Sequence, residues 1–240
     1  MALPSKAAAP AFDAPVLDEI KEKLVTACHI LDHEGVTDGY GHVSVRVPGA
    51  DAFITIANVS PGLASLDRLI MQDFDGNYLG GAETPPNEWP IHACVLRARP
   101  DVMSVAHTHS VWSTIFSVLP IKLKPLHHYG KFLSADGPPV YEGVGLVRTV
   151  DRGEALAAAL GDGPAVLMRA HGDTVVGASI EQMVERTTRL AMLGEWNHLA
   201  LLHGEPRYLT SEELEAYNAD QRFPLRGWEY FVSRLKKRGS

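Results

Sequence analysis

Two histidines separated by one residue close a short apolar stretch near the middle of the chain. Residues 102–108 read as a strand, and His107 and His109 stand at its end. Residues two apart on a strand point to the same face of a sheet, so both imidazoles can reach one ion. A His-x-His pair also arises by chance, but sites usually lie where a strand opens into a loop. The pair therefore predicts two ligands of a metal site.

A third histidine, His171, lies in a tight connection between two apolar segments, 165–169 and 174–177. A histidine there can simply be a turn residue. As a metal ligand it would complete a set of three imidazoles and leave coordination positions open for substrate oxygens. Such a set predicts a divalent cofactor: zinc first, with manganese or cobalt as alternatives.

A carboxylate and a further histidine begin the predicted helix 88–99. Glu88 in the first turn could merely compensate the helix dipole. In a water-poor pocket, however, a carboxyl group with a raised pKa can act as a general acid and base. His92 lies one turn later on the same face, where it would pack or support Glu88 by hydrogen bonding. We predict that Glu88 and His92 are catalytic.

Six other residues are weaker candidates for substrate binding. Arginine recognises carboxylates with two parallel hydrogen bonds, and tryptophan can stack on a ring. Each candidate also has a structural alternative in the sheet, in a loop, on a solvated helix face or in a subunit contact. The six predicted substrate-binding residues are Ser44, Arg46, His128, Arg222, Arg226 and Trp228.

Helical and strand patterns alternate along the chain. Asp75-Gly76 between two strand patterns is a hairpin signal, so the sheet should not be all parallel. Helix and strand interleaving predicts one α/β domain, residues 16–240, with a central, mostly antiparallel or mixed sheet between helices. The predicted helices are 16–33, 88–99, 179–203 and 211–219, and the predicted strands are 42–47, 53–57, the two arms of 69–79, 102–108, 165–169 and 174–177.

Composition excludes several classes of protein. The 240 residues carry a net charge of −7, which argues against a nucleic-acid partner. No apolar run reaches the roughly 20 residues of a transmembrane helix. Residues 1–15, rich in Ala and Pro, predict a disordered tail or an arm on a neighbouring subunit. Cys28 and Cys94 stand among apolar neighbours and predict buried, reduced thiols in a cytoplasmic protein.

Three ordered segments together resemble the class II aldolase/adducin family, over roughly residues 16–205. The resemblance implies the family fold, a three-layer arrangement with a mostly antiparallel sheet, and homotetramers of fourfold symmetry with metal sites near subunit interfaces. The segments are Gly41-His42-Val43-Ser44-Val45-Arg46; the run from Glu88 and His92 through Arg99-Pro100-Asp101 to Ala106-His107-Thr108-His109-Ser110; and His171-Gly172 followed by Val176-Gly177.

The resemblance also implies roles for individual residues. His107, His109 and His171 match the zinc ligands, and Glu88 matches the catalytic acid/base of the aldolases. An Asp stands at that position in the epimerase branch, so Glu88 favours an enzyme that cleaves carbon–carbon bonds. The adducin branch has lost ligands that this chain keeps, which disfavours the alternative of a non-enzymatic binding or scaffold protein.

Three departures from the sugar-phosphate aldolases point to another substrate. His42 stands where those enzymes have an Asn, and the phosphate-binding loops are replaced by residues 60–62 (Ser-Pro-Gly) and 84–86 (Thr-Pro-Pro). Backbone and hydroxyl donors for a phosphate are thereby depleted. The chain looks more like members that decarboxylate hydroxylated aromatic or pyridine dicarboxylates. We therefore expect a lyase acting on a small, non-phosphorylated hydroxy- or oxo-carboxylate. The expected reaction is decarboxylation of a hydroxylated aromatic or heteroaromatic acid, with aldol cleavage as the alternative.

Overall fold

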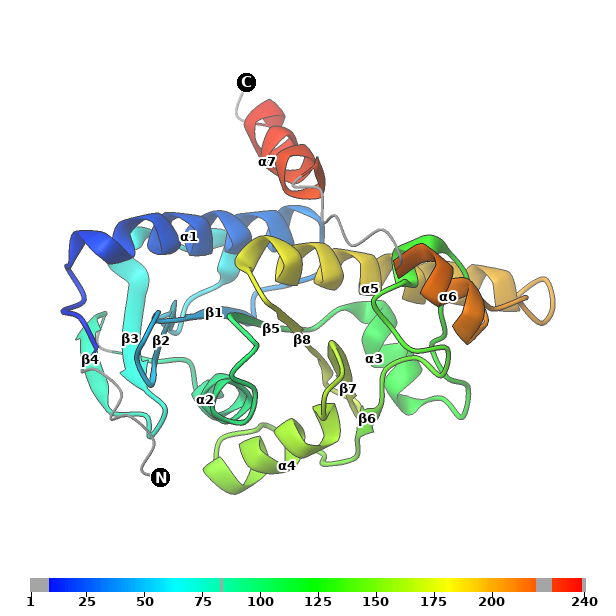
Figure 1. Ribbon diagram of the computed structural model, residues 1–240, viewed down its shortest axis with the longest axis horizontal. Helices are drawn as coiled ribbons and strands as arrows, with labels where there is room; N and C mark the ends of the chain where they lie inside the picture. Colours follow the sequence, from blue (N-terminus) through cyan, green and yellow to red (C-terminus); the bar gives the residue numbers. More distant parts are fainter. Residues whose placement is uncertain (1–8, 83, 219–225, 239–240) are drawn as a thin grey trace.

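The computed structural model describes residues 9–82, 84–218 and 226–238, and it contains one eight-stranded sheet in the order β4-β3-β2-β1-β5-β8-β7-β6 (Figure 1). Neighbouring strands are antiparallel except β6 and β7, which are parallel. The predicted mixed, mostly antiparallel sheet is thus confirmed. The strands are β1 (His42–Arg46), β2 (Ala52–Ile56), β3 (Leu69–Asp73), β4 (Tyr78–Gly81), β5 (Ser104–Thr108), β6 (Val140–Tyr141), β7 (Ala165–Met168) and β8 (Gly172–Gly177).

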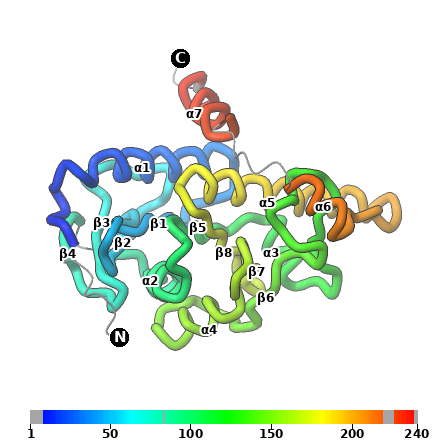
Figure 2. Tube along the Cα trace, in the orientation of Figure 1, coloured from blue at the N-terminus to red at the C-terminus, as the bar shows by residue number. Residues whose placement is uncertain are grey.

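Helices cover both faces of the sheet, which gives three layers (Figure 1). One face packs against α1, α3 and α5, and the other against α2 and α4. A further helix, α7, lies outside the layer of α1 and α5, away from α2 and α4 (Figure 2). The helices are α1 (Asp18–His33), α2 (Trp89–Ala98), α3 (Val111–Val118), α4 (Val150–Leu160), α5 (Ile180–Leu201), α6 (Ser211–Asn218) and α7 (Arg226–Arg238).

Side chains along β1 alternate between the two faces of the sheet. Val43 and Val45 point into the apolar core under α1 and α5. Ser44 and Arg46 point the other way, toward α2, as the period of two predicts. The same alternation on β5, which pairs with β1, places His107 opposite His42. The central strands are covered on both faces, so these polar side chains are buried beneath α2.

Three helices, α3, α4 and α7, were not predicted. The sequence of α3, Val-Trp-Ser-Thr-Ile-Phe-Ser-Val, is rich in β-branched residues and carries no clear helical pattern. In α4, Gly153 interrupts an otherwise helical segment and lowers its intrinsic helix propensity. The glycine serves packing instead: a Cβ there would stand 2.7 Å from Cys94 Sγ of α2. Contacts between layers therefore stabilise helices that local sequence does not predict.

The start of the chain packs against the edge of the sheet. Phe12 packs on β4: a Cβ added at Gly80 would stand 2.5 Å from the Cβ of Phe12. Of the predicted tail 1–15, residues 1–8 lie outside the described residues, and the domain boundary stays a prediction. Among residues 9–82, 84–218 and 226–238, no helix has both the length and the apolar character needed to cross a membrane.

Candidate active site

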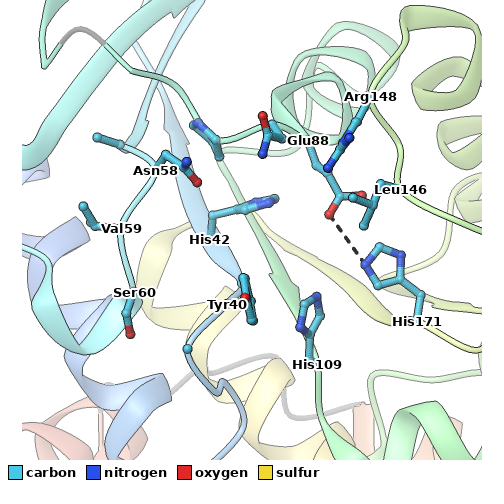
Figure 3. Close-up of a pocket in the computed structure, with 15 residues that line it drawn as sticks. Tyr40, His42, Asn58, Val59, Ser60, Glu88, His109, Leu146, Arg148 and His171 are labelled. Carbon is cyan, nitrogen blue, oxygen red and sulfur yellow. Dashed lines mark ion pairs between the residues drawn. The ribbon is translucent and has the colours of Figure 1, made fainter.

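A pocket of about 670 Å³ opens beside the ends of β1, β5 and β8 (Figure 3). Its walls come from segments far apart in the sequence: the loop before β1, the loop after β2, the start of α2, the end of β5, the β7–β8 turn and the segment before α4. The side chains that matter for its chemistry are those of Tyr40, His42, Glu88, His109, Arg148 and His171.

Four side chains converge beside this pocket, and three of them, Glu88, His109 and His171, line it. Glu88, His107, His109 and His171 each offer one donor atom, and these atoms all lie within 4.8 Å of one another. The Nε2 atoms of His107 and His109 are 3.2 Å apart. Glu88 Oε2 lies 3.5 Å from His171 Nε2 and 3.7 Å from His107 Nε2. The structure thus brings together all four residues that the sequence singled out first.

The pairing of β5 with β8 positions these histidines. His107 lies within β5 and faces Thr174 of β8, while His109 follows the strand directly. The β7–β8 turn then returns His171 to the same end of β5. Ala170 adopts a φ of +56°, a left-handed conformation that L-residues rarely take. Gly172 allows close approach, because a Cβ there would stand 2.0 Å from the Thr108 carbonyl oxygen.

Hydrogen bonds leave lone pairs on the nitrogens that face one another. His107 Nδ1 lies 2.9 Å from the Asp173 carbonyl oxygen, which can only accept, so Nδ1 carries the proton and Nε2 a lone pair. His109 Nδ1 lies 3.5 Å from Asp38 Oδ1, which likewise favours a proton on that nitrogen. Both ring nitrogens of His171 are buried and make no hydrogen bond within the part of the chain that the structure describes.

Burial keeps these imidazoles neutral. Desolvation, reinforced by the neighbouring histidines, lowers the pKa of His107 well below its usual range. Desolvation and His109 lower the pKa of His171 to about 4. Neutral imidazoles whose lone pairs converge, next to one carboxylate oxygen, form a donor set suited to zinc or a similar divalent ion. The unpaired His171 nitrogens fit such an ion, since a cation would satisfy them.

Glu88 stands at the N-terminus of α2, where its backbone carbonyl starts the helix by accepting from Ile91. Its Oε1 accepts a 2.6 Å hydrogen bond from the Val147 N–H, which leaves Oε2 toward the histidines. Burial raises the pKa of Glu88, and the Val147 hydrogen bond and the charge of Arg148 oppose that effect. The carboxyl group is therefore fixed in orientation, with one oxygen available for chemistry.

A second pair of histidines forms a hydrogen-bonded chain behind the pocket wall. His42 Nδ1 lies 2.6 Å from His92 Nε2, and His92 Nδ1 lies 2.7 Å from Ser44 Oγ. His42 lines the pocket, and its ring centre is 5.0 Å from that of His107. His92 is fully buried, does not line the pocket, and burial lowers its pKa to about 3. His92 therefore orients His42, and Ser44 orients His92.

Arg46 and His128 also lie apart from the pocket lining. The Arg46 guanidinium donates to the carbonyls of Val102 and Arg99 at 3.0 Å and to that of Leu96, and so ties the end of α2 to the strands. His128 lies in a 3₁₀ turn, His128–Gly130, and its ring contacts that of His127 in a tilted arrangement, with the ring centres 4.1 Å apart. Substrate binding by Ser44, Arg46 and His128 stays a prediction that this placement does not support.

Two of the C-terminal candidates, Arg226 and Trp228, lie on the other side of the sheet. Arg226 is exposed at the start of α7, and Trp228 packs against the core beneath α1 and α5. The pocket and Glu88 instead lie with α2. Arg222 falls outside the described residues. Within one chain the structure therefore does not bring Arg226 or Trp228 to the pocket, and substrate binding by the C-terminal candidates stays a prediction.

Several pocket residues had no sequence signal. Arg148 and Leu146 come from the irregular segment before α4, which has no periodicity, and Asn58 and Asn87 stand in loops. Tyr40 directly precedes the glycine-led segment 41–46, so that segment could have indicated it. A lone residue in a loop carries no local pattern, and only the folded chain places it.

Comparisons with known proteins agree with this geometry. The model of the class II aldolase and adducin N-terminal domain matches residues 22–197. A 3,4-dihydroxyphthalate decarboxylase from Arthrobacter keyseri is 34% identical over 68% of this chain and 71% of its own length. A second 3,4-dihydroxyphthalate decarboxylase, from a Terrabacter species, is 30% identical over 82% of this chain and 87% of its own length. An aldolase II superfamily protein from Pseudomonas syringae has the same fold, with a TM-score of 0.83, 24% identity and coverage of 94% and 95%.

Proposed function

The chain belongs to the class II aldolase and adducin family, and we propose that it is a metal-dependent carbon–carbon lyase that decarboxylates a hydroxylated aromatic acid. One observation carries the proposal: three imidazoles and one carboxylate oxygen converge within 4.8 Å at the wall of a pocket large enough for an aromatic ring. A purely structural role would not require lone pairs aimed at one another in a solvent-connected cavity.

The substrate class follows from the relatives and from the donor set. The two relatives described above are decarboxylases of 3,4-dihydroxyphthalate, which carries a hydroxyl group next to a carboxylate. Such a pair of adjacent oxygens suits a metal that keeps open coordination positions. We propose that His107, His109 and His171 hold a divalent ion, zinc in the first instance. When bound, the ion would supply Lewis-acid stabilisation of negative charge on the substrate.

We propose that Glu88 donates the proton that the reaction requires. In decarboxylation the bond between the ring carbon and the carboxylate breaks, its electron pair stays on the ring carbon, and carbon dioxide leaves. The ring carbon must gain a proton, which Glu88 Oε2 can deliver, because the Val147 N–H occupies Oε1. Glu88 recovers a proton from water afterwards. The side chain is only 6% exposed, which limits competing contact with bulk water.

We expect residues 60–62 to bind a phosphate group less well than the corresponding loop of a sugar-phosphate aldolase. Residues 60–62 correspond to a phosphate loop in the resemblance described above, and here the Asp32 carboxylate lies against them. A Cβ at Gly62 would stand 2.7 Å from Asp32 Oδ2. A fixed negative charge beside this segment repels a phosphate group. This supports a non-phosphorylated acid as the substrate.

We also propose a homotetramer. Several large apolar side chains are exposed on the single chain, including Tyr40 at 72%, Val111 at 64% and Leu202 at 67%. Tyr40 lies on the pocket rim, so a neighbouring subunit that covers it would also close the site. Light scattering at working concentration measures the assembly, and a monomer would contradict it.

The decisive experiment is Glu88→Gln assayed with 3,4-dihydroxyphthalate. We expect wild-type protein to release carbon dioxide, and the variant to lose about 10²- to 10⁴-fold in kcat while keeping its metal, as expected for loss of a general acid. Glu195→Gln, which changes an exposed carboxylate on α5, is the matched control and should keep full activity. An active Glu88→Gln variant, or a wild type that cleaves only aldol substrates, would contradict the proposal.

A further inference from the structure

We propose that Arg148 binds the carboxylate that the substrate keeps, and so makes the enzyme specific for aromatic 1,2-dicarboxylates. The inference rests on the proposed function and adds a residue that determines specificity at the same site. In a 1,2-dicarboxylate, one carboxylate is lost as carbon dioxide and its neighbour on the ring remains. A site for such a substrate needs a cation beside the reacting groups, at the position of the retained carboxylate.

Arg148 has the required position. Among the fifteen described residues that line the pocket, it is the one arginine or lysine. Figure 3 shows its side chain on the same wall as Glu88, near the carboxyl group that would deliver the proton. The charge of Arg148 reaches that carboxyl group, since it opposes the effect of burial on the pKa of Glu88.

The guanidinium of Arg148 is also free to bind a ligand. Within the part of the chain that the structure describes, no hydrogen bond or ion pair engages it, whereas other arginines of the molecule are occupied. Arg152 donates to the carbonyls of Leu146 and Val144 at 2.7 and 2.9 Å. Arg46 donates to three backbone carbonyls, and Arg169 contacts Glu142 at 3.1 Å. An unengaged guanidinium in a pocket is suited to bidentate recognition of a carboxylate.

The backbone around Arg148 is held in place from two sides. The N–H of Val147, its neighbour, donates to Glu88 Oε1 at 2.6 Å. The two hydrogen bonds from Arg152 fix residues 144–146 to the start of α4. The long side chain therefore starts from a fixed point next to Glu88. Because the backbone at Arg148 is linked to Glu88, the Arg148 guanidinium can bind one substituent of a ring while Glu88 protonates the neighbouring ring carbon.

Electrostatics require such a residue. A 1,2-dicarboxylate brings two negative charges into a pocket that already contains Glu88, in a chain whose net charge is −7. A divalent ion offsets the charge at the oxygens that it binds. The carboxylate on the next ring carbon still needs a partner, because an unpaired charge in a partly buried site is costly. Arg148 is the described lining residue that can supply this charge.

Equilibrium binding tests the inference without any turnover. The probes are 3,4-dihydroxybenzoate, which keeps the carboxylate, and catechol, which lacks it. Calorimetry on the metal-loaded wild type should show that the acid binds about 10- to 150-fold more tightly, the range expected for a charge-assisted hydrogen bond. Arg148→Met should abolish that preference and leave catechol binding unchanged. Arg148→Lys should restore part of it, since charge remains but the bidentate geometry is lost.

The matched control is Arg207→Met, an exposed arginine that follows α5 and does not line the pocket. It should bind both probes as the wild type does. If Arg148→Met weakens both probes equally, or neither, the inference is overturned. A wild type without preference for the acid would overturn it as well.

Kinetics on a second pair of compounds separates this inference from the proposed function. The acid 2,3-dihydroxybenzoate equals 3,4-dihydroxyphthalate without the carboxylate that is kept. Arg148→Met should lower kcat/KM for the phthalate about 10- to 150-fold and change it little for the benzoate. If the wild type binds the probes with the expected preference but releases no carbon dioxide from either acid, the proposed function fails and the role of Arg148 as a carboxylate site stands.

Discussion

Two groups of histidines lie around the paired strands β1 and β5 and differ in how their nitrogens are paired. In the pocket group, His107, His109 and His171, ring nitrogens face one another and Glu88, and His171 makes no hydrogen bond among the described residues. In the supporting group, His42 and His92, the facing nitrogens are hydrogen-bonded in a chain that ends at Ser44. In the pocket group lone pairs face one another, whereas in the supporting group each facing pair of atoms shares a hydrogen bond.

Burial alone does not distinguish the groups. His92 and His107 are both fully buried, and desolvation lowers the pKa of each far below its usual range. The difference lies in hydrogen bonding: His92 has a partner on each side, whereas lone pairs converge around His107 Nε2. Convergent lone pairs need a cation, while paired nitrogens need only each other. Pairing of nitrogens therefore separates a ligand site from its supporting structure.

The largest expected effect comes from removing a pocket histidine. His109→Ala should lower metal affinity by more than about 100-fold, because even partners outside the ligand set cost 10- to 100-fold when removed. Activity should disappear with the metal. Elemental analysis after dialysis measures the content and also identifies the ion. His203→Ala, an exposed histidine after α5, is the control. A fully loaded His109→Ala variant would remove the difference between the two groups.

A smaller effect on metal content, but a clear effect on stability, is expected for the supporting group. His92→Phe keeps a ring but leaves His42 Nδ1 and Ser44 Oγ without their partner in a buried site. The free energy of unfolding should fall by about 1–3 kcal/mol, the cost of an unsatisfied buried group. Urea unfolding gives this value, and metal content should stay near that of the wild type. Loss of the metal in this variant would place His92 with the pocket group.

The smallest effect is expected at the end of the chain of hydrogen bonds. Ser44→Ala should destabilise the protein by about 0.5–1.5 kcal/mol, since it removes one hydrogen bond to His92. In the His92→Phe background the same substitution should cost much less, because the partner is already absent. Urea unfolding of the four proteins completes the cycle. Equal costs in both backgrounds would mean that the Ser44–His92 bond contributes nothing.

The sequence predicts the features that depend on local patterns. Alternation along β1 separates Val43 and Val45 in the core from Ser44 on the opposite face, because a strand has a period of two. The hairpin at Asp75-Gly76 follows from its turn residues. The turn at His171 follows from the apolar segments on either side of it. Its role as third ligand depends on the family resemblance as well, since only the pairing of β5 with β8 brings it to His107.

Other features depend on contacts between distant segments. Arg148 reaches the pocket from an irregular stretch, fixed by hydrogen bonds to Glu88 and from Arg152, and no local pattern indicates it. The helical states of α3 and α4 depend on packing against other layers. Arg226 has the right chemistry for a carboxylate, but α7 lies outside α1 and α5, away from α2, whose start carries Glu88 (Figure 2). The residue types at the C-terminus were suited to binding a carboxylate, but no sequence pattern indicated where the fold would place them.

The pairing of β5 with β8 has a further consequence for the life of the protein in a cell. It joins ligand segments that are more than sixty residues apart, so the proposed ion can bind all of them only in the native state. A ligand that binds only the native state adds about 4 kcal/mol to stability at a free concentration near 1,000 times its Kd. Metal supply would then govern resistance to unfolding and proteolysis, and the amount of this protein would rise and fall with the free ion.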